Sequence, residues 1–395
     1  MENFLTLDQL QAQGKRVLVR LDLNLPTQNG QVTDLTRLTR SLRTLKELTA
    51  MGAKVIVMAH MGRPRGEDPS LTLAPIAQAL KKAMGPTPVF FCEAYQGSRV
   101  DEKIKSLHPG EILLLENIRF AEGEEKNDPT FAHQMARWGD IYVNDAFSAA
   151  HRAHTSTEGI AHLLPSYAGR LMEEELKALT QALTHPKKPL MAIVGGAKVS
   201  TKLPLLEHLT EKVDVLVVGG AMANTFLAAQ GYDVGASLYE PDLLETAKTL
   251  LTRKCEILLP IDGVVATSLE DEESVRTCLV SDLKSDEKIF DMGPLTVTHI
   301  LERLQSCHTL LWNGPVGVFE IPPFDQGTTA VATGVARLTR QGSLLSVAGG
   351  GDTVAALAHA DVMDDFSYVS TAGGAFLEWL EGKPLPGVVA LEPTL

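Results

Sequence analysis

The sequence predicts an α/β protein in which two domains each contain a buried parallel β-sheet. Short apolar runs rich in β-branched residues recur along the chain, and helix-like stretches separate most of them, a pattern typical of parallel sheets with helices on both faces. At 395 residues, the chain is longer than one hydrophobic core usually organises. The expected strands are residues 16–23, 54–59, 112–115, 141–143, 191–194, 213–218, 256–260, 309–312 and 344–348. The clearest expected helices are residues 35–51, 74–84 and 205–212.

A helix near the middle of the chain is expected to link the two domains. Acidic residues 173–175 suit the positive end of a helix dipole, and residues 185–189 contain two prolines that stop the helix. We therefore predict a linker helix over residues 169–185, between a first domain of residues 1–168 and a second of residues 186–377. Four apolar side chains mark the buried face of this helix, namely Met172, Leu176, Leu179 and Leu183.

Composition and charge exclude several classes of protein. The chain is 44% hydrophobic and 22% charged, an ordinary balance for a globular protein, and its apolar runs are too short to cross a bilayer. Residues 1–4 lack the basic start of a signal peptide, and the four cysteines show no metal-binding spacing, so we expect a cytoplasmic protein with no membrane partner. A net charge of −13 disfavours nucleic acid as a partner, yet the first 170 residues hold 20 basic against 19 acidic side chains. That part of the chain could still hold an anion.

The glycine run 349–351, followed by Asp352 and Thr353, is the most informative local feature. It lies between a strand-like run, residues 343–348, and a helix-prone stretch, residues 354–360. Glycines let backbone N–H groups approach an anion, and a helix N-terminus adds partial positive charge. The Asp352 carboxylate supplies a hard oxygen ligand for Mg²⁺. The run therefore predicts a Mg-nucleotide phosphate site, although an ordinary tight βα turn is the alternative.

Four further glycine turns occur in the second half of the chain, and the first three of them follow expected strands. In open α/β sheets ligands bind at the carboxyl ends of the strands, where these turns would gather. Lys198 and Lys202 are four residues apart and would share a face of a helix, above the glycine turn that precedes them. Their spacing is not that of a Walker loop, and a solvated lysine pair is the alternative. The four turns are residues 195–197, 219–221, 313–320 and 370–375.

Basic side chains in the first half of the chain, all except Arg37, lie at or just beyond the ends of expected strands. Asp22 and Asn24 alternate at the end of the first strand and therefore point the same way. Arginine binds phosphate and carboxylate through two parallel hydrogen bonds, so a converging set would suit a small, multiply charged anion. The alternative is that each arginine lies alone on the surface. The histidines, including His154, show no metal or nucleophile spacing. The candidate basic residues are Arg37, His60, Arg63, Arg119, His151 and Arg152.

The chain resembles the phosphoglycerate kinase family in several motifs that occur in the family's order. The likeness extends from about Phe4 to the C-terminus. It implies two Rossmann-like domains joined by an interdomain helix, with residues 378–395 returning to the first domain. The motifs that carry it are residues 16–26, 60–64, 116–120, 195–202, 312–320 and 349–353.

The resemblance also implies an activity and its ligands. Members of the family transfer the acyl phosphate of 1,3-bisphosphoglycerate to ADP, reversibly, giving 3-phosphoglycerate and ATP in glycolysis and gluconeogenesis. The first domain would hold 3-phosphoglycerate or 1,3-bisphosphoglycerate, and the second would hold ATP or ADP with Mg²⁺. The protein would be a monomer whose domains close about the linker helix when both ligands are bound. No general acid, base or covalent nucleophile is needed, because the carboxylate leaving group is weakly basic.

The family's functional residues match residues of this chain one by one. Arg37, Lys198, Gly350 and Gly373 would stabilise charge on the transferring phosphoryl group, Glu320 would bind the ribose, and Asp352 would bind the metal. The implied substrate-binding residues are Asp22, Asn24, Arg37, His60, Arg63, Arg119, His151 and Arg152. The implied nucleotide-binding residues are Gly195, Ala197, Lys198, Lys202, Gly219, Gly220, Asn313, Pro315, Glu320, Gly349, Gly350, Gly351, Asp352 and Thr353.

The chain departs from the family's usual pattern at a few positions. Ala221 and Ala372 each replace a glycine of a triple-glycine turn, and Ala221 puts the affinity for the base in question. Leu25 stands where a smaller residue is common, and residues 148–149 replace a usual Gly-Thr pair. None of the charged residues that match the family's motifs is missing, so the sequence predicts an active enzyme.

Two other functions are weighed against this one. A nicotinamide-dependent dehydrogenase would also use glycine turns, but no first-strand G-x-G-x-x-G with a later ribose-binding acid occurs. The other alternative is a catalytically weak metabolite-binding relative of the same fold. The retained Arg37, Lys198 and Asp352 argue against it.

Overall fold

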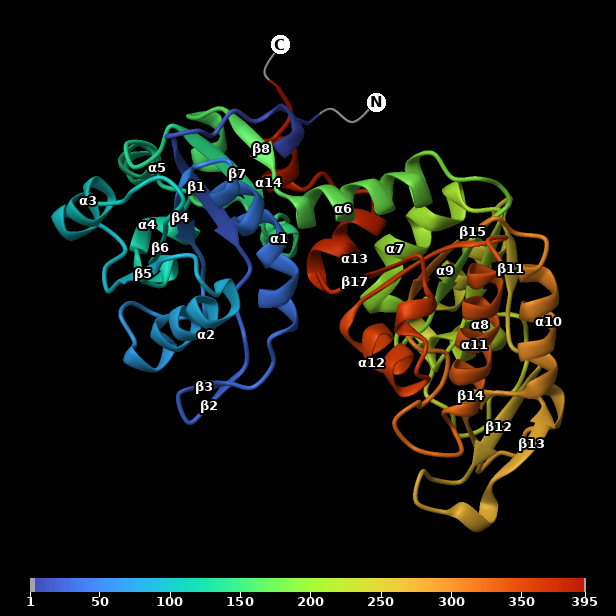
Figure 1. Cartoon of the computed structure of the whole chain (residues 1–395). Helices are drawn as coiled ribbons and strands as arrows, with labels where there is room; N and C mark the ends of the chain where they lie inside the picture. Colours follow the sequence, from blue (N-terminus) through green and yellow to red (C-terminus); the bar gives the residue numbers. More distant parts are fainter. Residues whose placement is uncertain (1–3, 394–395) are drawn as a thin grey trace. The chain divides into compact units, whose positions relative to one another are not determined.

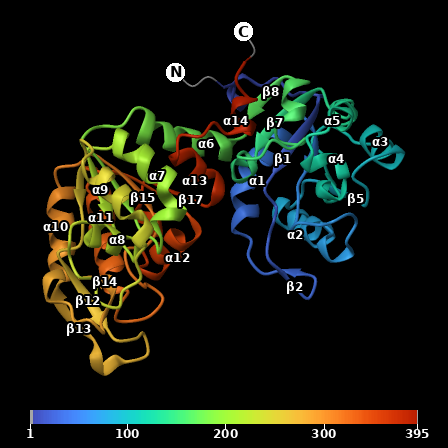
Figure 2. The ribbon, with the colours of Figure 1, turned by 180° about the vertical axis from the view of Figure 1, so that it is seen from behind.

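The computed structural model describes residues 4–393, and the chain divides into two compact units (Figures 1 and 2). The first unit runs to Leu176 and includes the segment from Pro384 onward, and the second is Lys177–Lys383. The division therefore falls inside the stretch expected as a linker, residues 169–185. The C-terminal segment joins the first unit at Pro384, six residues after the expected start at Glu378.

The first unit contains a six-stranded parallel sheet in the order β5-β6-β4-β1-β7-β8. Its central strands are buried on both faces, which is why they appear in the sequence as continuous apolar runs. The strands are β1 (Arg16–Leu21), β4 (Lys54–Met58), β5 (Val89–Cys92), β6 (Ile112–Leu115), β7 (Ile141–Asp145) and β8 (Ser166–Ala168). A separate hairpin joins β2 (Thr27–Gln28) to β3 (Gln31–Val32).

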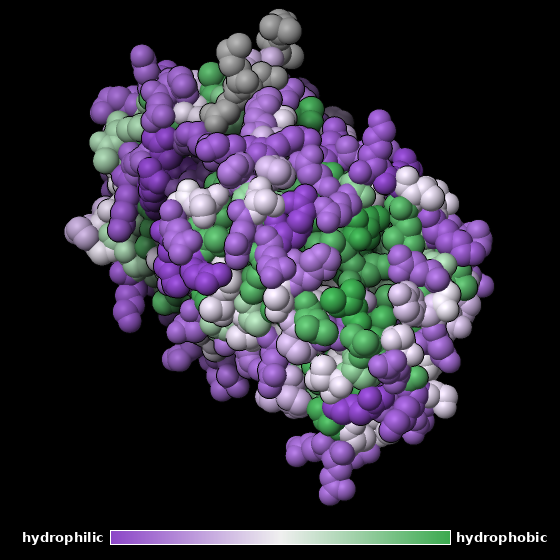
Figure 3. Space-filling model, turned by 90° about the vertical axis from the view of Figure 1, so that its right-hand side faces the viewer, coloured by the Kyte–Doolittle hydropathy of each residue, from purple (hydrophilic) through white to green (hydrophobic). Residues whose placement is uncertain are grey.

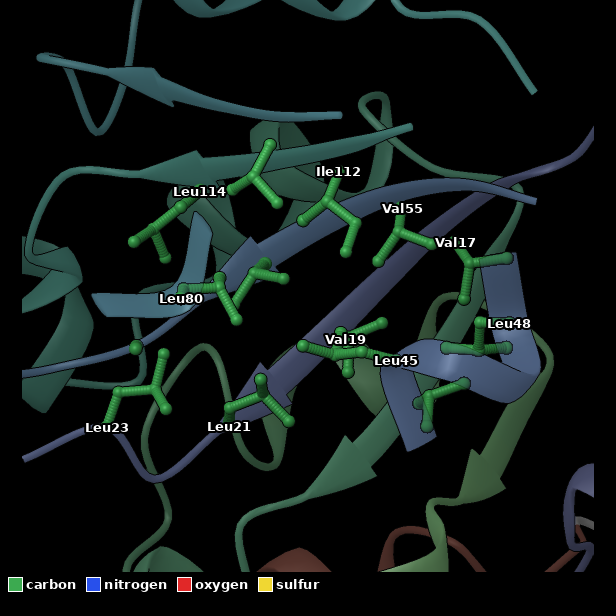
Figure 4. Close-up of a cluster of buried hydrophobic side chains, with 14 of the residues drawn as sticks. Val17, Val19, Leu21, Leu23, Leu45, Leu48, Val55, Leu80, Ile112 and Leu114 are labelled. Atoms are coloured by element: carbon green, nitrogen blue, oxygen red, sulfur yellow. The ribbon is translucent and has the colours of Figure 1, made fainter. Parts of the chain in front are cut away.

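Alternate side chains of these strands form the hydrophobic core of the first unit (Figure 4). Val17, Val19 and Leu21 of β1 lie at its centre, and Leu45 and Leu48 of α1 pack against them. The α-helices of this unit are α1 (Thr36–Ala50), α2 (Ala74–Met84), α3 (Ser98–Lys105), α4 (Glu122–Glu125), α5 (Pro129–Ala136) and α14 (Pro386–Val389). The 3-10 turns are η1 (Leu7–Gln9), η2 (Pro69–Leu71), η3 (Ile118–Phe120), η4 (Phe147–Ala149) and η5 (Gly159–His162).

The second unit contains a six-stranded parallel sheet in the order β11-β10-β9-β15-β16-β17. Met191, Leu310 and Trp312 of its central strands are buried with Ile300 and Val335 of the covering helices. The strands are β9 (Leu190–Val194), β10 (Val215–Val218), β11 (Glu256–Leu258), β15 (Thr309–Asn313), β16 (Leu345–Gly349) and β17 (Tyr368–Ser370). The helices are α7 (Val199–Lys212), α8 (Met222–Ala229), α9 (Leu244–Leu251), α10 (Pro294–Leu304), α11 (Gln326–Arg340), α12 (Gly351–His359) and α13 (Gly374–Leu380), with 3-10 turns η7 (Pro241–Leu243) and η10 (Met363–Asp365).

A three-stranded antiparallel sheet in the second unit was not predicted. Its order is β13 (Arg276–Leu279), β12 (Asp262–Ala266) and β14 (Lys288–Met292), and the turns η8 (Glu272–Ser274) and η9 (Val280–Asp282) join its strands. Every residue of β13 and most of β14 is partly or fully exposed, so these strands lack the continuous apolar run of a buried strand. Prediction from apolar runs alone therefore found nine of the twelve strands of the parallel sheets, but missed the short strands β5, β8 and β17 and this antiparallel sheet.

The predicted linker helix covers nearly all of the expected residues, 169–185, but its last turn differs in type. Helix α6 spans Arg170–Leu179 and is followed by one π-helical turn, η6 (Thr180–Thr184). Met172, Leu176 and Leu179 are buried as the spacing predicts, whereas Leu183 in the π-helical turn is half-buried.

The start of α6 is held by buried acidic side chains. Asp145, at the end of β7, accepts hydrogen bonds from the backbone N–H groups of Leu171 at 2.8 Å and Met172 at 3.1 Å. Burial raises the pKa of this carboxyl to about 7. Glu173 is also buried and pairs with Arg170 at 2.8 Å. Within the acidic run 173–175, Glu173 is therefore buried and ion-paired rather than exposed to solvent.

The surface of the second unit carries several exposed hydrophobic side chains. Among its largest are Tyr232, Leu238, Ile261, Leu279 and Leu295. Figure 3 shows that hydrophobic residues gather over a broad area of the face it draws. None of the helices within residues 4–393 combines the length and the apolar composition that a membrane crossing requires.

Candidate active site

A cavity of about 560 Å³ in the second unit lies at the carboxyl ends of the parallel strands. The five predicted glycine turns directly follow β9, β10, β15, β16 and β17, which are neighbours in the sheet. Gathering of the turns at one edge of the sheet is thus confirmed. The cavity is lined by Gly195, Gly196, Ala197, Thr201, Lys202, Gly220, Ala221, Leu238, Lys288, Ile289, Phe290, Gly314, Pro315, Gly317, Val318, Glu320 and Asp352.

One end of the cavity is polar and carries Lys202 opposite glycine backbone. The Lys202 ammonium donates to the carbonyl of Gly195 at 2.6 Å and to the side-chain oxygen of Asn313 at 2.8 Å. Burial lowers the pKa of Lys202 to about 8, while the nearby Asp352 carboxylate acts in the opposite direction. Gly220 has φ +68°, and a Cβ there would lie 2.5 Å from the carbonyl oxygen of Gly196. The turns approach one another too closely for side chains at Gly220, so backbone groups form much of the surface near Lys202 and Asp352.

Asn313 and Thr353 connect the glycine turns to each other. The Asn313 amide donates to the carbonyl of Gly349 at 2.9 Å, and the Thr353 hydroxyl accepts from the N–H of Gly314 at 2.7 Å. Both side chains are buried, and neither lines the cavity. Their contacts in this structure therefore fix the shape of the turns.

Lys198 does not share a helical face with Lys202, so that expectation is wrong. Lys198 is the N-cap of α7 with an extended backbone (φ −131°, ψ 132°), and the helix begins at Val199. The side chain of Lys198 is exposed and does not line the cavity. Pro204 lies within the first two turns of α7 without ending the helix.

Another part of the cavity wall is built from residues of β14 that sequence reasoning missed. Ile289 and Phe290 belong to β14 of the unpredicted antiparallel sheet. The N–H of Val318 donates to the carbonyl of Phe290 at 2.9 Å, which ties the loop that carries Glu320 to this strand. Lys288 also lines this wall. No local motif marks these positions, since β14 reaches the cavity only through the tertiary fold.

The buried carboxylate of Asp291 lies next in sequence to Phe290 of the cavity wall. Asp291 accepts from the N–H of Gly327 at 2.7 Å, in the first turn of α11, and from the N–H of Met292 at 2.9 Å. Burial raises the pKa of Asp291 to about 7, and the charge of Asp325 acts in the same direction. Asp291 thus joins the antiparallel sheet to the start of α11.

In the first unit, Asp22 and Asn24 hold two of the predicted basic residues in place. Arg37 lies 3.1 Å from the Asp22 carboxylate and donates to the backbone carbonyl of Asn24 at 3.2 Å. The side-chain oxygen of Asn24 accepts from the N–H of Gly62 at 3.1 Å. This bond anchors the turn that carries the exposed Arg63.

Arg119 is a buried cation with an unused donor. One of its terminal nitrogens donates to the carbonyl of Gly62 at 2.7 Å, whereas its Nε makes no hydrogen bond within residues 4–393. The exposed Glu125 lies 3.5 Å from that nitrogen. Burial and the charge of Arg20 lower the pKa of Arg119 to about 10. A crowded cation with a free donor is suited to binding an anion.

Two histidines lie in the same cluster of cations. Burial and the charges of Arg119 and Arg20 lower the pKa of His154 to about 4. Burial and the same two arginines hold the pKa of His60 well below its usual range. At the edge of the cluster, Arg152 donates to a ring nitrogen of His151 at 3.2 Å. The candidate list omitted Arg20 and His154, although both lie within or beside quoted motifs.

Comparison with known proteins identifies the family. The family model described as "Phosphoglycerate kinase" matches residues 7–383. The chain belongs to the phosphoglycerate kinase family.

Curated relatives and solved structures cover almost the whole chain. The phosphoglycerate kinase of Azorhizobium caulinodans is 55% identical over 395 residues, 99% of this chain and 100% of that protein. The corresponding protein of Rhodospirillum centenum is 58% identical over 393 residues, 98% of this chain and 99% of that protein. The structure of phosphoglycerate kinase from Coxiella burnetii matches with a TM-score of 0.91 at 42% identity, and that from Pyrococcus horikoshii with 0.80 at 30%, each covering 98% of both chains.

These similarities confirm several expectations from the sequence. The family resemblance, the α/β fold with two parallel sheets and the assignment to a kinase are correct. A nicotinamide-dependent dehydrogenase is therefore excluded as the function of this family member.

The structure brings together part of the predicted nucleotide set. The residues that line the cavity are Gly195, Ala197, Lys202, Gly220, Pro315, Glu320 and Asp352. The predicted residues that do not line it are Lys198, Gly219, Asn313, Gly349, Gly350, Gly351 and Thr353. The roles assigned to individual residues stay predictions.

Proposed function

We propose that this chain is an active phosphoglycerate kinase that transfers the acyl phosphate of 1,3-bisphosphoglycerate to ADP, reversibly, to give 3-phosphoglycerate and ATP. The observation that supports it most directly is the buried Arg119, whose Nε makes no hydrogen bond within the part of the chain that the structure describes. The exposed Glu125, 3.5 Å from this nitrogen, compensates the buried charge only in part, so an arriving anion that accepts from Nε would stabilise the guanidinium further. A strongly anionic acid is what this family's reaction requires.

The basic cluster of the first unit, Arg37, His60, Arg63, Arg119 and Arg152, is proposed to bind the acid. Asp22 and Asn24 orient Arg37 and the Gly62 turn, as their hydrogen bonds indicate. His151 contacts Arg152 and would act from the edge of the cluster.

The cavity of the second unit is proposed to bind ADP or ATP. Its glycine turns offer backbone N–H groups to the phosphates, Glu320 lies on its wall as the ribose ligand, and Leu238 and Phe290 offer apolar surface to the base. Lys202 adds one ammonium at the polar end. Asn313 and Thr353 hold the turns in shape and support this binding indirectly.

The residues present suit Mg²⁺ held jointly by the protein and the nucleotide. Within residues 4–393, no three His, Cys, Asp or Glu side chains form a group that could hold a metal alone. Asp352 lines the cavity with an exposed carboxylate, and Mg²⁺ commonly takes one carboxylate together with substrate phosphates and water. When bound, the ion would supply positive charge at the nucleotide phosphates.

Transfer itself is proposed to need alignment and charge neutralisation from the protein. Arg37, Lys198 and the backbone N–H groups at Gly350 and Gly373 are assigned to the oxygens of the transferring group. In-line transfer requires the reacting atoms nearly in contact and water excluded, so we propose that the units close when both ligands are bound. We further propose a cytoplasmic monomer, and the four cysteines, all unpaired, suit a reducing compartment.

A forward assay with 1,3-bisphosphoglycerate and Mg-ADP, reading out ATP, tests the proposal. Turnover should be lost on chelation of Mg²⁺ and restored when the ion is added back. The Glu122→Gln variant changes an exposed ion pair with Lys126 and should leave activity unchanged, which controls for handling of variants. A correctly folded protein that binds both ligands without turnover would support the catalytically weak relative instead.

A further inference from the structure

A buried hydrogen-bonded chain leads from Glu124 to the basic cluster of the first unit. Glu124 of α4 is fully buried, and its two carboxylate oxygens accept from the Ser156 hydroxyl at 2.5 Å and the Ser156 N–H at 2.9 Å. Ser156 is itself buried and in turn accepts a hydrogen bond from the Nε of Arg20 at 2.8 Å. Three elements far apart in the sequence thus meet at one hydroxyl.

Arg20 continues this chain to His60. Its side chain is fully buried, donates to the carbonyl of Leu21 at 2.5 Å, and lies with a terminal nitrogen 3.0 Å from the Nδ1 of His60. A guanidinium carries donors only, so the Nδ1 of His60 must accept this bond. In a neutral imidazole the single proton then resides on Nε2. The structure therefore selects one of the two tautomers of His60.

The charges around His60 also keep it neutral. The neighbouring groups that act most strongly on it are the basic side chains of Arg20, Arg119, His154 and Arg37. Burial and these neighbours hold the pKa of His60 well below its usual range. His60 thus presents an N–H donor whose position does not depend on gaining a proton.

We propose that Glu124 and Ser156 are positioning residues that hold Arg20 against His60 and so keep the His60 proton on Nε2 as a donor to the acid substrate. This inference rests on the proposed function for its substrate, and on the hydrogen bonds above for its mechanism. Neither residue belongs to the candidate set that the sequence suggested. Both act through Arg20, and neither is proposed to touch the ligand.

A buried carboxylate is suited to this task because its negative charge, which reaches Arg20 through the Ser156 hydroxyl, offsets the charge of the buried guanidinium. Burial raises the pKa of Glu124, and the charge of Arg20 opposes this shift. Removing one partner of a buried ion pair leaves the other uncompensated, so Arg20 should shift when Glu124 or Ser156 changes. A displaced Arg20 would free the Nδ1 of His60, and both tautomers would then become populated.

The test combines Glu124→Gln and Ser156→Ala with Glu122→Gln as the matched control on the same short helix. In protein labelled with ¹⁵N at the histidine rings, long-range ¹H–¹⁵N spectra of the free protein report the tautomer of His60 directly. Wild type and Glu122→Gln should show the Nε2–H form alone, whereas Glu124→Gln and Ser156→Ala should show a mixture. A His60→Gln sample assigns the signals.

Kinetics then separate positioning from general damage. Ser156→Ala should raise the KM for 3-phosphoglycerate about tenfold, in line with one lost hydrogen bond to a charged group, with little change in kcat or in the KM for Mg-ATP. The inference is overturned if Ser156→Ala keeps the Nε2–H form alone, or if wild type shows the Nδ1–H form. If Glu124→Gln fails to fold, Ser156→Ala still decides the matter. Because the spectra need no turnover, failure of the proposed function would leave this result readable.

Discussion

The two units build their candidate anion sites from different materials. In the first unit the site consists of side chains, namely buried cations such as Arg119 that are held by hydrogen bonds to other parts of the fold. In the second unit it consists mainly of backbone at glycine turns, with Lys202 held among those turns and Lys288 on the β14 side of the cavity. Side chains in a fixed arrangement suit one small acid, whereas backbone N–H groups suit the common phosphate chain of a nucleotide.

The two sites also differ in their electrostatic cost before a ligand binds. In the first unit, burial and then the charges of neighbouring cations lower the pKa of Arg119 to about 10 and that of His154 to about 4. In the second unit, burial lowers the pKa of Lys202 to about 8, but the Asp352 carboxylate opposes that shift. The first site should therefore gain more from an anion of high charge.

The largest expected effect comes from removing one proposed transition-state cation in each unit. Arg37→Ala and Lys198→Ala should each lower kcat by about a hundred- to a thousandfold, because loss of one preorganised donor to developing charge has that size. Steady-state kinetics measure it. Lys198 is exposed in this structure. If Lys198→Ala raises KM and leaves kcat unchanged, Lys198 does not stabilise the transition state, and Arg37 of the first unit would be the remaining proposed side chain with that role.

A crossed pair of substitutions tests whether each ligand depends on its own unit. Asp352→Asn should weaken binding of Mg-ADP about tenfold or more, because the carboxylate is the proposed metal ligand. Arg119→Gln should do the same to 3-phosphoglycerate, and each variant should leave the other ligand unaffected. Calorimetric titration of each ligand separately measures both. If Asp352→Asn weakens the binding of both ligands equally, Asp352 is a structural residue, and this pair of variants gives no support for one ligand site in each unit.

The two units should share one dependence on pH. Burial raises the folded-state pKa of Asp145 and of Asp291 to about 7, well above the ordinary value for an aspartate. The unfolded chain then loses these protons first, so their contribution to stability falls as pH rises from about 4 to about 7. Asp145→Asn and Asp291→Asn should each flatten the pH dependence of the unfolding free energy in this window by roughly 1–4 kcal/mol. Urea unfolding at several pH values would show it, and an unchanged slope would contradict the assignment.

The smallest expected effect is a change of size in solution. We expect 3-phosphoglycerate together with a Mg-nucleotide to compact the protein more than either ligand alone, since transfer needs both ligands in contact. Small-angle X-ray scattering on the free, singly bound and doubly bound forms measures the radius of gyration. The same radius in all four states would rule out a large closure.

The sequence by itself determined the central strands of the two parallel sheets and the glycine turns, but not the short strands β5, β8 and β17 at the sheet edges. Buried strands need continuous apolar runs, and turns with φ above zero, such as those at Gly220 and Gly350, need glycine. Both features can therefore be recognised from a few consecutive residues. The ordered motifs were sufficient to identify the family. Seven of the predicted nucleotide residues do line the cavity for the same reason, because they lie on or beside those turns.

Only the tertiary structure decided which side chains meet. Arg20 and Ser156 are 136 positions apart, and no local pattern pairs them. Phe290 forms a cavity wall because a half-exposed antiparallel sheet carries it there, and Lys198 leaves the helical face because the helix begins one residue later. Asn313 and Thr353 bind neighbouring turns to each other across the sheet edge. Contacts of this kind depend on the distances between elements. The sequence periodicity within one element contains no information about those distances.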